Sequence, residues 1–131
     1  MAFLEKDFQS LFTKHIKKEF PLTGAFELKL TKKDSIAFNR LEEHQETNLK
    51  KVKHGCQFYK ISDQSRGQKP YDAFQICNGN AFVVVMFYVP RAPKIAYLID
   101  IDVWCKERDE NNRKSLTLDR AKEISGITLY L

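Results

Sequence analysis

The stretch that most constrains this chain is the unbroken apolar run from Ala81 to Val89, Ala-Phe-Val-Val-Val-Met-Phe-Tyr-Val. Side chains of a β-strand alternate between the two faces of a sheet, so a strand that is apolar at every position is buried on both faces. Its β-branched and aromatic residues favour a strand, and Pro90 ends it. We therefore expect this run to be the central strand of a sheet flanked by helices.

The rest of the chain alternates between helix-like and strand-like patterns. Apolar spacing predicts helices over 3–20, from about 38 to 55, and over 115–124. Strands are predicted at 26–32, 56–61, 71–77, 94–101 and 127–131, with a tight hairpin turn at Asn78-Gly79-Asn80. Residues 103–107 are expected to form only a short piece. A length of 131 residues suits one domain. We expect an α/β (α+β) domain over 1–131, with a single mixed sheet flanked by helices.

Composition narrows the class of protein. No apolar run approaches the roughly 20 residues that span a bilayer. Acidic residues near the start do not suit a targeting segment, so we expect a cytoplasmic protein without membrane contact. The net charge of +5, from 22 basic and 17 acidic side chains, favours a polyanionic partner such as nucleic acid.

The cysteines predict little chemistry of their own. Cys56, Cys77 and Cys105 are odd in number, lie far apart, and lack the paired spacing typical of zinc sites or redox couples. We expect reduced, structural thiols.

Glu27-Leu28-Lys29 is the first candidate for chemistry. Within the predicted strand at 26–32, Glu27 and Lys29 share one face while Leu28 points to the other, apolar face. A carboxylate can hold a divalent metal while a neighbouring lysine steadies phosphate charge or orients water, which suits phosphodiester hydrolysis. The alternative is a surface strand with a salt-bridged polar face.

A second acidic candidate follows an exposed polar loop at 62–70. Asp72 enters a predicted strand, where a carboxylate is unfavourable unless it is paired or bound to metal. If this strand lies beside the strand of Glu27, both carboxylates meet at one magnesium site. The alternative is that Asp72 caps the loop or pairs with Lys69. Near it, Lys60, Arg66 and Lys69 are candidate phosphate contacts.

The predicted second helix has a thin apolar seam, Leu41, Leu49 and Val52, with His44 and Gln45 in its middle. Such a helix either lies on the surface or borders a cleft, and we favour the cleft.

These residues carry a resemblance to a known family. Glu27-Leu28-Lys29 resembles the E-x-K half of the PD-(D/E)xK nuclease signature. Residues 35–49, with His44-Gln45, resemble the helix that follows it in Holliday-junction resolvases of the bacterial RecU and related phage type. The resemblance covers 26 to about 50 well and the remainder loosely. It implies a restriction-endonuclease-like core, a Mg²⁺-dependent endonuclease (Mn²⁺ substituting), branched DNA as partner, a homodimer, and Gln45 facing the active site.

The chain departs from this family in one respect. The family usually places its aspartate on a strand before E-x-K, yet no Asp stands between Phe20 and Glu27. Asp72 must then be a relocated ligand from downstream. In another alignment, Asp72 is followed by Val85 and Phe87 in place of Glu and Lys, which leaves an inactive enzyme. The first alignment is preferred because it also explains Gln45.

The combined hypothesis is a metal-dependent endonuclease of a bacterial or phage-infected cell. Glu27 and Asp72 hold Mg²⁺, Lys29 positions the attacking water, and Gln45 supports the nucleophile or phosphate. The basic residues named above grip the DNA backbone. The rival is an inactive nucleic-acid-binding or protein-interaction module on the same fold. The substrate structure (junction, flap, nick or RNA-containing) and the role of Glu5 stay open.

Overall fold

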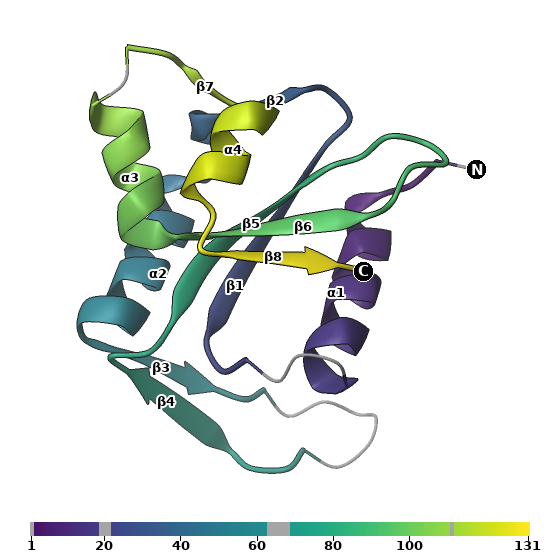
Figure 1. The fold of residues 1–131 in the computed structure, drawn as a ribbon. Coiled ribbons are helices and arrows are strands. Elements are labelled where there is room, and N and C mark those ends of the chain that lie inside the picture. The colour runs from purple at the N-terminus through teal and green to yellow at the C-terminus, as the bar shows by residue number, and fades with distance from the viewer. Residues whose placement is uncertain (1, 19–21, 63–68, 111) are drawn as a thin grey trace.

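The computed structural model describes residues 2–18, 22–62, 69–110 and 112–131 (Figure 1). In chain order, the elements are α1 Glu5–Lys18, β1 Ala25–Thr31, β2 Ser35–Ala37, the 3₁₀ helix η1 Phe38–Arg40, α2 Glu43–His54, β3 Cys56–Lys60, β4 Ala73–Cys77, β5 Ala81–Phe87, β6 Ile95–Asp100, α3 Ile101–Glu110, β7 Ser115–Thr117, α4 Leu118–Ile124 and β8 Ile127–Tyr130. The mixed α+β class predicted from the sequence is confirmed.

The main sheet has four strands in the order β1-β5-β6-β8. β1 runs parallel to β5, whereas β5–β6 and β6–β8 are antiparallel, so the sheet is mixed. Ala81 to Met86 of β5 are all buried. The prediction that this apolar run is the central buried strand is confirmed, and so is the prediction that β8 is an edge strand.

Two cores cover the two faces of this sheet. On one face, Val83 and Val85 of β5 pack in a cluster with residues of α2, α3 and α4, such as Trp104 of α3. On the other, Val84 and Met86 pack with Phe8 and Phe12 of α1 and others. The strict alternation along β5 therefore separates a face covered by three helices from a face covered by α1 (Figure 1).

The expectation of a single sheet is wrong. Two further two-stranded sheets are present, β2–β7 and β3–β4. The first joins 35–37 to 115–117, and its ends are tied by Phe38 N donating to Lys114 O and Leu118 N donating to Asp34 O. Strands of three residues are too short to display an alternating pattern, so the sequence predicted no strand at 35–37 and the start of a helix at 115–117.

The expected tight hairpin turn at 78–80 does not join two paired strands. β4 pairs with β3, whereas β5 pairs with β1 and β6. Asn78 N donates to Gly55 O (2.9 Å) and Gly79 N to Val52 O (2.8 Å), and Asn78 has a φ of 49°. The turn therefore packs on the end of α2. Asn-Gly signals a reversal of the chain but not which strand becomes the partner.

Residues 101–110 form helix α3, where the sequence predicted only a short piece. Ile101, Trp104 and Cys105 are all buried, which is the i, i+3, i+4 spacing of one helical face. This stripe was missed because charged residues surround it, Asp102 within it and 106–110 after it. Within the described ranges, no helix is long and apolar enough to cross a bilayer.

Cys56 and Cys77 stand opposite each other across the β3–β4 ladder and are joined by a disulfide. The expectation of reduced thiols is wrong for these two residues and holds for Cys105, a buried free thiol. A separation of 21 residues carries no signal by itself. The pairing follows from the register of the β3–β4 hairpin. The residues around the two cysteines do not reveal that register.

Candidate active site

Glu27 and Lys29 project from β1 onto the face of the sheet that α2 covers. Their ladder partners on β5 are Val83 and Val85, which belong to the cluster packed with α2. Leu28 packs on the opposite side, with the α1 cluster. Because residues opposite each other in a ladder share a face, the acid and the ammonium lie together between the sheet and α2.

Gln45 reaches this pair from the first turn of α2. Its Oε1 accepts a hydrogen bond from Glu42 N (3.0 Å), as part of a capping box at the start of the helix. Its Nε2 donates to Glu27 Oε1 at 2.8 Å. Both ends of the amide are therefore engaged, which fixes its orientation. Glu27, Lys29 and Gln45 are called the Glu27 cluster below.

Lys29 is the most deeply buried member of the Glu27 cluster. Its side chain is 9% exposed, against 32% for Glu27, and its Nζ lies 3.6 Å from Glu27 Oε1. A buried ammonium needs a partner, and Glu27 supplies the opposite charge. Since Glu27 remains partly exposed, the cluster presents a carboxylate to solvent with a fixed cation and a fixed amide behind it.

Asp72 is not brought to this cluster by strand pairing. The described neighbour of β1 in its sheet is β5, so the expectation that the strand after Asp72 lies beside that of Glu27 is wrong. Asp72 directly precedes β4 in the β3–β4 hairpin, which projects from the lower end of the molecule in Figure 1. Its side chain is 91% exposed and pairs with Lys69 (3.0 Å). The alternative of a Lys69 partner is the arrangement found.

A preformed metal cage is not present in the part of the chain described. No group of three or more His, Cys, Asp or Glu side chains there is placed to hold a metal ion. Both contacts of Glu27 go to Oε1, and within the described residues no hydrogen bond or ion pair reaches Oε2. Magnesium keeps several waters and is often held by one or two carboxylates together with substrate phosphates. Glu27 therefore fits as a single protein ligand, and Asp72 does not lie beside it.

The two predicted phosphate contacts that the structure describes lie on or beside the β3–β4 hairpin. Lys60 is the last residue of β3 and is exposed, and Lys69 pairs with Asp72. Arg66 lies outside the described residues. Glu5, whose role the sequence left open, is 3.5 Å from Arg40 Nη2, which also donates to Leu30 O (3.1 Å). Arg40 thus links the start of α1 to the end of β1, and no spacing in the sequence pointed to it.

Charged contacts missed from the sequence hold α2 and α3 in place. Lys53 Nζ lies 2.5 Å from Asp100 Oδ2 and 2.8 Å from Asp102 Oδ2, and Asp102 also contacts His54 (2.7 Å). Burial alone favours neutral Lys53, but the hydrogen bonds and charges of the two aspartates outweigh it and raise the pKa of Lys53. These contacts anchor the end of α2 from which the hairpin departs.

Glu46, one residue after Gln45, forms the second such anchor. It pairs with Arg108 of α3 and with Lys50 (3.2 Å). Burial raises the pKa of the Glu46 carboxyl, but its hydrogen bonds to Arg108 and Lys50 outweigh burial and lower the pKa overall. The first turn of α2, which presents Gln45 to Glu27, is therefore fixed to α3 by a charged pair.

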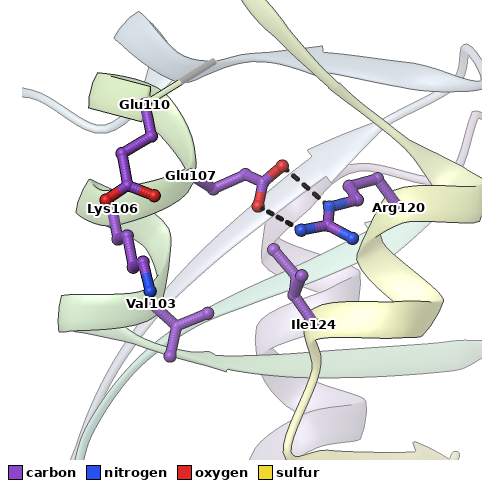
Figure 2. Close-up of a pocket in the computed structure, with 6 residues that line it drawn as sticks. All are labelled: Val103, Lys106, Glu107, Glu110, Arg120 and Ile124. Carbon is purple, nitrogen blue, oxygen red and sulfur yellow. Dashed lines mark hydrogen bonds and ion pairs between the residues drawn. The ribbon is translucent and has the colours of Figure 1, made fainter.

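A pocket of about 430 Å³ lies between α3 and α4 (Figure 2), and none of the residues that line it belongs to the Glu27 cluster. Both oxygens of Glu107 accept from Arg120, at 2.8 and 3.0 Å. A carboxylate engaged by a bidentate guanidinium is a poor candidate for metal binding or base catalysis, since its lone pairs are already used. This pair joins α3 to α4.

Searches of family models, curated proteins and solved structures returned nothing that matches this chain. The geometry of the chain's own residues is therefore what points to its function.

Proposed function

We propose that this protein is a Mg²⁺-dependent, structure-selective DNA endonuclease of the Holliday-junction-resolvase type, built on a restriction-endonuclease-like core. The observation that carries the proposal is the Gln45 Nε2 to Glu27 Oε1 hydrogen bond of 2.8 Å. It joins a strand bearing Glu-x-Lys to the helix that follows it, between residues that are 18 positions apart. The resemblance implies that Gln45 faces the active site, and this contact supports that placement, whereas a merely salt-bridged surface strand does not require it.

The chemistry assigned to the Glu27 cluster follows from its charges. Glu27 Oε2 is the atom suited to hold a divalent ion, which would supply a polarised phosphate and an activated water when bound. Lys29, fixed by burial, holds a positive charge where negative charge develops on the phosphate. Gln45 orients Glu27 by its Nε2 donor and keeps the carboxylate from rotating.

Asp72 is proposed as the second metal ligand, reaching the Glu27 cluster only when DNA and metal are bound. Its single described ion pair is with Lys69, three residues away and on the same exposed segment. Surface pairs of this kind contribute about 0–1 kcal/mol, so little is lost when the carboxylate leaves it. Arg66, Lys60 and Lys69 would then contact the DNA backbone beside it.

The test is metal-dependent nicking of a branched DNA substrate at a stated, modest salt concentration, since phosphate contacts weaken steeply with salt. Glu27→Gln should lower cleavage by about 100-fold or more while retaining DNA binding in EDTA. Glu43→Gln, an exposed glutamate in the first turn of α2, is the matched control and should cleave like the wild type. Full cleavage by Glu27→Gln would reject the proposal.

A second candidate is a nucleic-acid-binding module without catalysis on the same fold. The observation in its favour is the exposure of Asp72, 91% of the side chain, away from any described carboxylate cluster. Under this function, the wild type binds branched DNA but leaves it intact at every Mg²⁺ or Mn²⁺ concentration. Catalysis by the wild type that depends on Glu27 removes this candidate.

A further inference from the structure

The outer face of the β3–β4 hairpin carries a single aromatic ring that the fold does not use. Phe58 is 61% exposed, and among the described residues no other ring contacts it. On the opposite face of the hairpin, Tyr59 and Phe74 stack on each other, with ring centroids 5.5 Å apart and an interplanar angle of 8°. Tyr59 and Phe74 are exposed too, but each ring is covered on one side by the other, whereas neither burial nor stacking accounts for Phe58.

Two polar side chains lie beside Phe58 on the same face. Lys60 is two residues further along β3, so it points the same way, and it is exposed. Gln75 is the ladder partner of Phe58 and is also exposed. We call Phe58, Lys60 and Gln75 the outer-face triad. Because Ile76, one residue on, packs against the core near α2, the triad faces solvent.

We propose that the outer-face triad binds one unpaired nucleotide of a DNA strand, with its base stacked on Phe58. An exposed ring offers its face to any base, which is the usual basis of single-strand binding without sequence preference. The ammonium of Lys60, one strand repeat away, is placed for the adjoining phosphate, and the amide of Gln75 both donates and accepts hydrogen bonds at a base edge.

A second copy of the chain is a poorer occupant of this face. A stable protein interface buries about 1,200 Å² or more in total, and one ring flanked by polar side chains offers little apolar area. Two chains of net charge +5 also repel each other, whereas a DNA strand is attracted. The disulfide at the root of the hairpin, Cys56–Cys77, keeps the two strands of the triad in register.

This inference rests on the proposed function in taking DNA as the ligand, and it deepens it by naming the feature that is bound: a base outside the duplex. The test needs no catalysis. Phe58→Trp places an indole at the stacking position, while the native Trp104 is fully buried and gives a constant background. Titration with short oligothymidylate in EDTA should quench the new indole saturably.

Tyr130→Trp is the matched control, because Tyr130 is 68% exposed on β8, in a different sheet. Its indole should show no saturable quenching. In an anisotropy titration with labelled oligothymidylate, Phe58→Ala should weaken binding about fivefold or more, and Tyr130→Ala should not. Phe58→Trp should bind at least as tightly as the wild type, which shows that the ring and not the fold is measured.

Three outcomes would overturn the inference: no quenching of Phe58→Trp, equal quenching of both indoles, or unchanged affinity of Phe58→Ala. Indole emission that changes with protein concentration in the absence of DNA would assign the face to a second copy and overturn it too. A wild type that never cleaves DNA, together with quenching at Phe58→Trp, sinks the endonuclease proposal alone. Cleavage that depends on Glu27, without quenching, sinks the stacking inference alone.

Discussion

The Glu27 cluster and the β3–β4 hairpin are two halves of one predicted site, and they are built in different ways. The Glu27 cluster is fixed by buried elements, with Lys29 at 9% exposure and Gln45 engaged at both ends of its amide. Asp72, on the hairpin, is 91% exposed and pairs only locally in the described chain. The Glu27 cluster is therefore preorganised, whereas Asp72 would have to be brought to it.

Preorganisation matters for catalysis because groups already in place need no rearrangement as charge develops. The Glu27 cluster meets this condition through two supports, the central strand β5 beneath it and the Glu46–Arg108 pair behind the start of α2. The hairpin has instead a disulfide at its root and aromatic stacking at its middle. It is a stiff arm anchored at one end, which suits a part that docks when substrate arrives.

The largest expected effect comes from Lys29, at the centre of the preorganised half. Lys29→Met keeps an unbranched stem of similar volume but removes the charge, so metal-dependent nicking should fall about 100-fold or more. The free energy of unfolding should fall as well, because removing one partner of a largely buried pair leaves Glu27 without its counter-charge. Single-turnover cleavage and urea unfolding measure the two effects.

Lys32→Met is the control for that experiment, because Lys32 is an exposed lysine directly after β1. Lys32→Met should lower the cleavage rate only slightly, as expected when one weak phosphate contact is lost. If Lys29→Met cleaves at the wild-type rate, then Lys29 serves only as the counter-charge of Glu27. The Glu27 cluster would then lack the catalytic lysine that the proposal assigns to it.

The disulfide gives the next largest effect and acts on the hairpin alone. Cys56→Ser with Cys77→Ser removes a cross-link that spans 21 residues, which should lower the free energy of unfolding by about 3 kcal/mol. Urea unfolding of oxidised wild type and double variant measures it. Limited proteolysis should begin in the hairpin, since the contacts of the Glu27 cluster do not depend on the cross-link. Simultaneous proteolysis of β1 would show that the two regions form one cooperative unit.

How far the sequence predicted the fold depended on how local each signal was. The apolar run of β5 and the alternation at Glu27 are read from neighbouring residues, and both were correct. The resemblance implied that Gln45 faces the active site; its amide donates to Glu27, and its role there stays a prediction. The Cys56–Cys77 pairing and the partner of β4 depend on strand register across distant residues, which no local pattern reports.

The same contrast between local and long-range signals applies to the residues of the candidate site. Glu27 and Lys29 are two residues apart, so their shared face follows from the geometry of any strand. Strand pairing would bring Asp72 to them only if β4 lay beside β1, and among the described strands β1 pairs with β5 while β4 pairs with β3. Helix α3 escaped prediction because its buried apolar positions are few and the acidic and basic residues that tie it to α2 and α4 surround them.

Acid should weaken the support behind the preorganised half. The pKa of Glu46 in the folded chain is below its ordinary value of 4.5, because its hydrogen bonds to Arg108 and Lys50 outweigh the opposing effect of burial. Its stabilisation is therefore fully present above pH 4.5 and is lost as the pH falls through the lower, folded-state pKa. Glu46→Gln should be less stable than the wild type at neutral pH, with a smaller loss on acidification.

Urea unfolding at a series of pH values between neutral and acid measures this difference. Glu43→Gln is again the control, since Glu43 shares the first turn of α2 but is exposed. Identical acid profiles for the wild type and Glu46→Gln would mean that the Glu46–Arg108 pair does not hold the start of α2. The fixed amide of Gln45 would then need another explanation.

The smallest expected effect on stability, and the sharpest test of the comparison, comes from Asp72. Asp72→Asn removes a solvent-exposed pair with Lys69, so the free energy of unfolding should change by no more than about 0.5 kcal/mol. If Asp72 docks as a relocated metal ligand, the same change should raise the Mg²⁺ concentration needed for half-maximal cleavage, while Asp119→Asn, an exposed aspartate on α4, leaves it unchanged. A protein that is stable, binds DNA and needs more metal identifies a ligand that arrives with substrate. Unaltered metal dependence would instead leave Glu27 as the sole carboxylate ligand and make the hairpin a DNA-binding arm only.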